Sequence, residues 1–185
     1  MVSFKENDTP GGKYYIMTVK IVTDSSADIP PHILKELDIT VVPLYICFGE
    51  QIYKDRIDIT EDEFYYRLVT DITHPRTIQP APQDFATVYH ELAKEATGIV
   101  SIHISSKLSG TWNSALQAAG EIHECPIEVI DSQILTMALG LVVISAARLA
   151  REGASFEEIV NHVKKTLPSM HLLGLLDTLK FLLLG

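Results

Sequence analysis

A hydroxyl-rich stretch in the middle of the chain carries the groups best suited to holding an anion. It is SSKLSGT, residues 105–111, and it follows an apolar run typical of a buried strand. Apolar residues then recur at the helical spacing i, i+3, i+4 and i+7: Trp112, Ala115, Leu116 and Ala119. Ser109 is therefore expected to be the N-cap of a helix, with Gly110 and Thr111 in the first turn. The unpaired amides of that turn and the helix dipole favour a negatively charged group, although a plain helix cap is the alternative.

Two further loops carry hydroxyl groups directly after a β-branched run. Asp24, Ser25 and Ser26 follow the run at 19–23, and Asp131-Ser132 follows the run at 127–130. Ligands of parallel α/β sheets lie beyond the carboxyl ends of the strands. The three hydroxyl loops are therefore expected to converge on one crevice, with Ser25 as a second ligand wall. A cap before Pro30 is the alternative interpretation of this serine.

A proline-rich loop at residues 73–82 is expected to present two polar side chains in a fixed pose. Its prolines exclude a regular helix or a central strand, which makes the loop stiff: Pro75, Pro80 and Pro82. The polar side chains are Thr77 and Gln79, and a simple turn fixed by proline is the alternative. If the loop has a binding role, Thr77 and Ser109 should face one shared hollow.

Composition excludes several classes of function. The 185 residues are 46% hydrophobic and 21% charged, with a net charge of −9, which argues against a general nucleic-acid binder. Cys47 and Cys125 have no CxxC or metal-ligand spacing, so neither a disulfide framework, a zinc site nor another metal site is indicated. No P-loop motif is present and no cofactor is expected. With no apolar run near the ~20 residues of a membrane span and no signal peptide, a cytoplasmic protein without stable membrane insertion is expected.

Strand-like and helix-like segments alternate along the chain, which predicts an α/β fold with a mostly parallel sheet and helices on both faces. The expected strands are 19–23, 40–48 with an interruption at Pro43, a short return strand within 51–59, 99–104 and 127–130. Helices are expected after Pro30, Thr60, Pro82 and Gly110, over 135–152, and from a capping box at Ser155.

Three segments are expected along the chain. Residues 1–16 form a polar leader without a packing role, expected to be disordered, and residues 17–167 form the α/β domain. Residues 168–185 are unusually leucine-rich and are interpreted as the beginning of a truncated second domain. Exposed leucines in this segment would also favour self-association of the chain.

Several of these motifs, in this order, resemble the DegV family of bacterial fatty-acid-binding proteins. The matching stretches are 22–30, Pro43-Leu44, 77–82, 102–111 and 129–132. The resemblance implies two domains that enclose one long-chain fatty acid, and a role in presenting it to a fatty acid kinase. It also implies that the carboxylate is held by Thr77 and a serine of SSKLSGT. Ser109 is preferred, and Ser105 and Ser106 remain open.

The sequence departs from the family pattern at two kinds of position. Ile78 and Ala81 replace serines of the proline-rich loop, and the chain ends where the family would continue into a second domain.

Each buried methylene contributes about 0.8 kcal/mol, so an acyl chain would supply most of the affinity and the polar anchor would set the orientation of the ligand.

The alternative function is a serine hydrolase or transferase acting on a small acyl substrate. Ser106 or Ser109 would be the nucleophile, and His74 is the only nearby base. No Gly-x-Ser-x-Gly elbow is present, so no catalytic residue is assigned. His103 lies within a strand and is interpreted as a structural histidine.

Overall fold

Four parallel strands form the central sheet of the computed structural model, which describes residues 18–176 and 179. The strands are β1 (Thr18–Asp24), β2 (Ile39–Val42), β6 (Ala96–His103) and β7 (Ile127–Asp131), in the order β2-β1-β6-β7. The register places Ile21 opposite both Ile39 and Val100, and Ile102 opposite Ile130. The predicted α/β class with a parallel sheet is confirmed.

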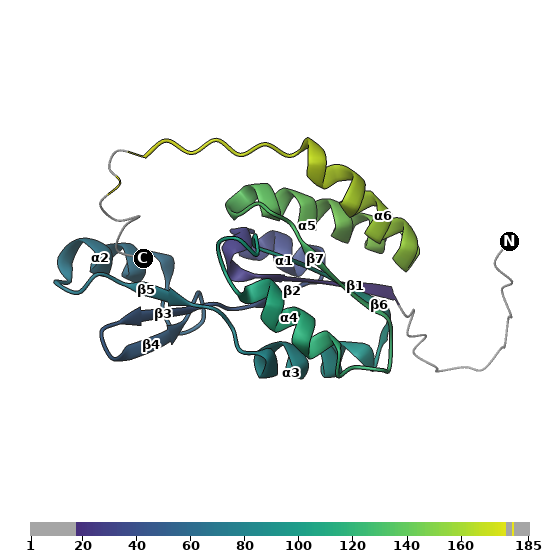
Figure 1. Cartoon of the computed structure of the whole chain (residues 1–185), viewed down its shortest axis with the longest axis horizontal. Helices are drawn as coiled ribbons and strands as arrows, with labels where there is room; N and C mark the ends of the chain where they lie inside the picture. The colour runs from purple at the N-terminus through teal and green to yellow at the C-terminus, as the bar shows by residue number, and fades with distance from the viewer. Residues whose placement is uncertain (1–17, 177–178, 180–185) are drawn as a thin grey trace, which may run out of the picture.

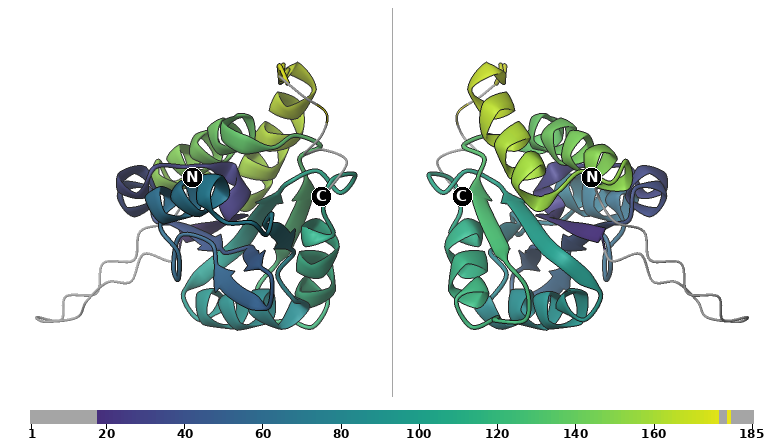
Figure 2. Two further views of the ribbon diagram at one scale, coloured as in Figure 1. Left: turned by 90° about the vertical axis from the view of Figure 1, so that its left-hand side faces the viewer. Right: turned by 90° about the vertical axis from the view of Figure 1, so that its right-hand side faces the viewer.

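Helices cover both faces of this sheet (Figure 1, Figure 2). One face carries α1 (Pro31–Glu36), α5 (Thr136–Arg151) and α6 (Phe156–Thr166), and the other carries α3 (Pro82–Ala93) and α4 (Thr111–Ala119). Strand β6 shows why both faces are covered, because its successive side chains alternate between the two cores. Val100 and Ile102 pack with the α5 side, while Ile99 packs with the α3 side.

A small lobe projects from one end of the central sheet (Figure 1). It contains a second, antiparallel sheet in the order β4-β3-β5, formed by β3 (Tyr45–Phe48), β4 (Gln51–Lys54) and β5 (Arg76–Ile78). Helix α2 (Glu61–Thr70) belongs to the same lobe. The core of the lobe is small: Ile46, Phe48 and Ile59, with Tyr53 and Phe64 packed against them.

The single strand predicted over residues 40–48 is wrong, because the chain forms two strands in two different sheets. Strand β2 ends at Val42 in the central sheet, and β3 begins at Tyr45 in the small lobe. Pro43 has no amide hydrogen to continue a ladder. The amide of Leu44 donates to the Ser25 hydroxyl at 3.1 Å instead of to a strand. The return strand predicted within 51–59 is confirmed only as far as Lys54.

Most helix starts follow the predicted caps, and one does not. Thr60 accepts from the Glu63 amide at 3.2 Å, and Ser155 forms the predicted capping box with Glu158. Ser109 is not the N-cap of α4; the N-cap is Gly110. A turn that ends with the Ser109 amide donating to the Ser105 carbonyl at 3.1 Å occupies the preceding residues and moves the helix start by one position.

The chain ends bear on several predictions made from the sequence. The leader at 1–16 lies outside the described residues. Helix α6 is followed by a 3-10 turn, η2 (Leu167–Ser169), and then by an irregular segment with exposed leucines: Leu172, Leu173, Leu175, Leu176 and Leu179. The 17–167 and 168–185 division and the self-association of this segment stay predictions. Over residues 18–176, no helix has the length and apolar character needed to cross a bilayer.

Candidate functional site

Two cavities meet at Thr77, at the junction of the central sheet and the small lobe. The polar cavity has a volume of about 470 Å³ and is lined by Ser25, Ser26, Asp28, Leu44, Ile46, Asp55, Arg56, Glu61, Phe64, Tyr65 and Thr77. The apolar cavity has a volume of about 390 Å³ and is lined by Ile46, Phe64, Leu68, His74, Pro75 and Thr77. Three residues line both: Ile46, Phe64 and Thr77. Each volume falls in the range of small-molecule sites.

The polar cavity is rich in negative charge. Arg56 pairs with Asp28 at 2.6 Å and with Glu61 at 3.1 Å, while no cation lies within ion-pair distance of Asp55 among the described residues. Burial raises the pKa of Asp28, and the charges of Asp55 and Glu61 raise it further against the opposing effect of Arg56. The charged groups that line this cavity therefore sum to −2 when all are ionised, from three carboxylates and one guanidinium.

The wall of the polar cavity beside β1 is a single 3-10 turn, η1 (Ser25–Ala27), capped by Asp24. One carboxylate oxygen of Asp24, Oδ1, accepts from both the amide and the hydroxyl of Ser26. The other, Oδ2, accepts from the Ile104 amide at 3.1 Å and from Nδ1 of His103 at 2.9 Å. Four donors thus fill the acceptor sites of one fully buried carboxylate, which fixes the ends of β1 and β6 relative to each other.

A chain of buried hydrogen bonds leads from helix α3 to Asp24. The Tyr89 hydroxyl donates to Ser101 at 2.7 Å, and Ser101 Oγ lies 2.7 Å from Nε2 of His103. The Asp24 carboxylate can only accept, so Nδ1 of His103 carries a hydrogen and donates it to Asp24. Burial raises the pKa of Asp24, but the hydrogen bond and charge of His103 outweigh it and the net shift is downward. Burial also raises the pKa of Tyr89.

The order Ser101, His103, Asp24 resembles the hydrogen-bond order of a hydrolase triad, but these side chains cannot meet a substrate. Ser101, His103 and Asp24 are all 0% exposed, and the Ser101 oxygen already accepts from Tyr89. A nucleophile must reach the reacting carbon, which burial prevents here. The prediction of a structural His103 is confirmed.

The predicted hydroxyl groups of the SSKLSGT loop lie apart from the two cavities. Ser109 lies 2.8 Å from the Thr111 hydroxyl and lines neither of these two cavities, so a hollow shared by Thr77 and Ser109 stays a prediction. Ser106 donates to Asp131 at 2.6 Å. The two loops meet instead at Gln79, whose Oε1 accepts from the Gly110 amide at 3.2 Å.

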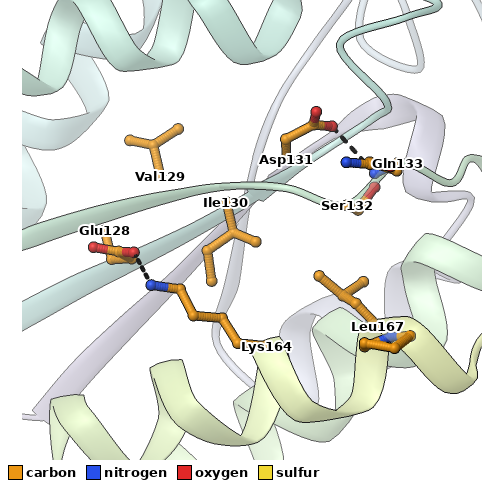
Figure 3. A pocket seen from close by; sticks show the side chains of 9 residues that line it. Glu128, Val129, Ile130, Asp131, Ser132, Gln133, Lys164 and Leu167 are labelled. Atoms are coloured by element: carbon orange, nitrogen blue, oxygen red, sulfur yellow. Dashed lines mark hydrogen bonds and ion pairs between the residues drawn. The ribbon is translucent and has the colours of Figure 1, made fainter.

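The three hydroxyl loops do not all line the polar cavity, because the loop after β7 lines another cavity. That cavity has a volume of about 550 Å³ and lies between β7 and the end of α6 (Figure 3). Lys164 pairs with Glu128 at 2.5 Å along its wall, and Ser132 lines it. Ser132 and Ser25 therefore lie at strand ends of one sheet but face different spaces.

Sequence reasoning missed the residues that give the site its character. Arg56 and Asp55 follow β4, and Ile46 and Phe64 come from β3 and α2. None of them belongs to a motif with chemical spacing. The one available signal was Pro43, which marks the point where the chain leaves the central sheet for the small lobe.

The structure is an α/β fold with two adjoining cavities, one polar and one apolar. The chain belongs to the DegV family. A family model described as "Uncharacterised protein, DegV family" matches residues 18–185.

Individual relatives agree with this assignment. A DegV domain-containing protein of Caldanaerobacter subterraneus is 41% identical over 167 residues, which cover 90% of this chain and 59% of the relative. A solved DegV family protein from Thermus thermophilus, described by its fatty acid binding, matches at 38% identity with a TM-score of 0.75, over 82% of this chain and 54% of that one. A stearic acid-binding protein from Eubacterium ventriosum matches at 34% identity with a TM-score of 0.73, over 79% and 52%. The chain thus spans a little more than half of the length of these relatives.

Proposed function

We propose that this protein is a lipid-binding protein that holds a long-chain fatty acid, with the carboxyl end in the polar cavity and the acyl chain in the apolar cavity. The observation that carries this proposal is the position of Thr77, which lines both cavities. A ligand that crosses this boundary must be polar at one end and apolar at the other. The fatty acid binding described for the relatives from Thermus thermophilus and Eubacterium ventriosum supports the same class of ligand.

The acyl chain is expected to supply most of the binding free energy. The apolar cavity presents Ile46, Phe64 and Leu68, and a methylene removed from water against such side chains contributes about 0.8 kcal/mol. A single hydrogen bond contributes about 0.5–1.5 kcal/mol. The polar groups therefore orient the ligand more than they hold it.

Among the site residues expected from the sequence, Thr77 and Ser25 are proposed to contact the carboxyl group directly. Gly110 is proposed to act through Gln79, which follows Thr77 by two residues. Ser106, Ser109 and Thr111 are proposed to shape the neighbouring loop.

Two measurements test the proposal: the identity of the lipid that co-purifies with the protein, and the effect on binding of removing the Thr77 hydroxyl. Mass spectrometry of the protein purified from bacteria and then denatured should recover a fatty acid at about one per chain. Thr77→Ala should weaken fatty acid binding about 2- to 10-fold, the range of one hydrogen bond. Thr87→Ala is the matched control, because Thr87 is exposed on α3 and donates only to the Gln83 carbonyl. Recovery of no lipid, together with no binding of added fatty acid, would refute the proposal.

We further propose that the bound fatty acid is presented to a fatty acid kinase that phosphorylates the carboxyl group. The position of the proposed carboxyl site among exposed residues of the small lobe supports this, because Thr77 and Glu61 are both exposed. Acyl phosphate formed by a purified fatty acid kinase should depend on the loaded protein and fall with Thr77→Ala. Equal turnover with free fatty acid and with the loaded protein would contradict presentation.

The serine hydrolase alternative gains no support from the described residues. Ser106 is bonded to Asp131, and Ser109 is bonded to Thr111. His74 lines the apolar cavity with Thr77, and neither serine lines that cavity. The same purified protein should therefore show no ester hydrolysis that Ser106→Ala or Ser109→Ala removes.

A further inference from the structure

The hydroxyl of Ser26 can only accept hydrogen bonds from the polar cavity. Its proton is committed to Oδ1 of Asp24, and Asp24 cannot donate in return because its carboxylate already accepts from four donors. The buried His103 maintains this arrangement from the other side of the carboxylate. Ser26 is half-buried and lines the cavity, so what it offers a ligand is a lone pair.

The hydroxyl of the neighbouring Ser25 can donate a hydrogen bond to the polar cavity, whereas Ser26 can only accept one. Ser25 Oγ accepts from the Leu44 amide, a group that can only donate. No acceptor is bonded to the Ser25 proton among the described residues, and this side chain also lines the polar cavity. Ser25 therefore offers a donor beside the acceptor of Ser26.

The charged and titratable groups that face this pair disfavour an anion. They are Asp28 after η1, Asp55 and Arg56 after β4, and Glu61 and Tyr65 of α2. Both ion pairs of Arg56 are with residues of this set, which leaves Asp55 uncompensated. A carboxylate entering here would meet net negative charge and the lone pairs of Ser26, whereas a neutral carboxylic acid has one acceptor and one donor to match the two serines.

We propose that the polar cavity binds the fatty acid in its protonated form, with the carbonyl oxygen accepting from Ser25 and the acid hydroxyl donating to Ser26. This inference rests on the proposed fatty acid binding and deepens it. Protonated carboxylic acids that donate a hydrogen bond in a protein site are known where the surroundings disfavour the charge. The buried chain from Tyr89 to Asp24 then has a role at the ligand, because it sets which way the Ser26 hydroxyl points.

The test reads the ionisation of the ligand directly. Palmitic acid labelled with ¹³C at the carboxyl carbon is bound to the protein, and its ¹³C chemical shift is followed from pH 5 to pH 9. The bound carboxyl should titrate at a pH at least about one unit above the same ligand bound to Ser26→Ala, which lacks the acceptor. Asp55→Asn removes one lining charge without touching the serines and should lower the midpoint as well. Thr87→Ala, on the exposed face of α3, should leave the midpoint unchanged.

The outcomes separate the two proposals. A bound signal that stays at the carboxylate position over the whole range, with the same behaviour in Ser26→Ala and Asp55→Asn, would overturn this inference and leave fatty acid binding intact. Absence of any bound signal for the unaltered protein would overturn both. Circular dichroism of each variant at every pH confirms that the shift is measured on folded protein.

Discussion

The Oε1 atom of Gln79 lies 3.2 Å from the backbone nitrogen of Gly110 and accepts its hydrogen bond. The two residues are 31 positions apart in the sequence. Gln79 follows β5 of the small lobe, and Gly110 lies in the loop after β6 of the central sheet. A Cβ atom on Gly110 would overlap the amide group of Gln79. The relationship explains why glycine occupies the N-cap of α4, where a polar side chain is usual.

Replacing Gly110 with alanine should therefore weaken ligand binding more than it weakens the fold. The added methyl group displaces the end of a flexible, exposed side chain, so the free energy of unfolding should change by no more than about 0.5 kcal/mol. Loss of the hydrogen bond that braces the Thr77 loop should weaken fatty acid binding about 2- to 10-fold. Gly174→Ala is the control, since a Cβ there meets nothing within 4 Å. Equal affinities of the two variants would show that the brace is irrelevant to binding.

Gly140→Ala should destabilise the protein through a backbone contact. Helix α5 passes so close to η1 that a Cβ on Gly140 would overlap the carbonyl oxygen of Ala27, which cannot rotate away. Overpacking of this kind costs about 1–3 kcal/mol. The higher helix propensity of alanine offsets about 1 kcal/mol of that cost, so the upper part of the range leaves a net loss of stability. Urea unfolding measures the difference. Gly120→Ala, whose Cβ would meet nothing closer than 3.4 Å, should be nearly neutral, and a neutral Gly140→Ala would contradict the close approach.

His103→Ala should be among the most destabilising single changes in the chain. It removes one donor from the buried Asp24 carboxylate and one of the two hydrogen-bond partners of the Ser101 hydroxyl. Removal of one member of a buried ionic or hydrogen-bonded pair costs about 3–5 kcal/mol. His90→Ala is the matched control, because His90 is exposed and its ion pair within the described part of the chain, with Glu124, spans 3.4 Å. If chemical denaturation gave similar midpoints for the two variants, the buried chain would not contribute to stability.

Acid should remove part of the stability through Asp24. The folded-state pKa of Asp24 lies below its ordinary value of 3.8, so the charged form is favoured by folding. Its contribution is present above about pH 4 and is lost as the pH falls below 3.8 towards the folded-state pKa. Unfolding free energies measured from pH 7 to pH 2.5 should therefore fall at the acid end.

Two aspartate variants test that assignment. Asp24→Asn should be less stable at neutral pH and should show a flatter acid limb, because it has no carboxylate to protonate. Asp38→Asn is the control; Asp38 is exposed, pairs with Lys20 on the surface, and has φ of 53°, which asparagine also adopts. An acid limb that is unchanged in Asp24→Asn would mean that other carboxylates cause the loss.

The local order of the chain could be predicted from its sequence because short-range physics decides it. Alternating β-branched runs and amphipathic segments are sufficient for an α/β fold, and Thr60, Pro82 and Ser155 mark helix starts through their own caps or fixed φ. The cap at Ser109 failed for the same kind of reason. A turn from Ser105 to Ser109 competes with the helix start, and single-residue preferences cannot show which hydrogen bond wins.

The site depended on contacts that no local pattern records. The sequence alone led to Thr77 and Ser25 as candidate site residues and to the family resemblance, because each rests on a short motif. The tertiary structure alone decided that Thr77 borders two cavities, that Asp24 and His103, 79 residues apart, share one hydrogen bond, and that Ser109 bonds the Thr111 hydroxyl. The physical reason is that local preference is set by neighbours along the chain, whereas cavities and buried hydrogen bonds are set by which segments pack together across the sheet.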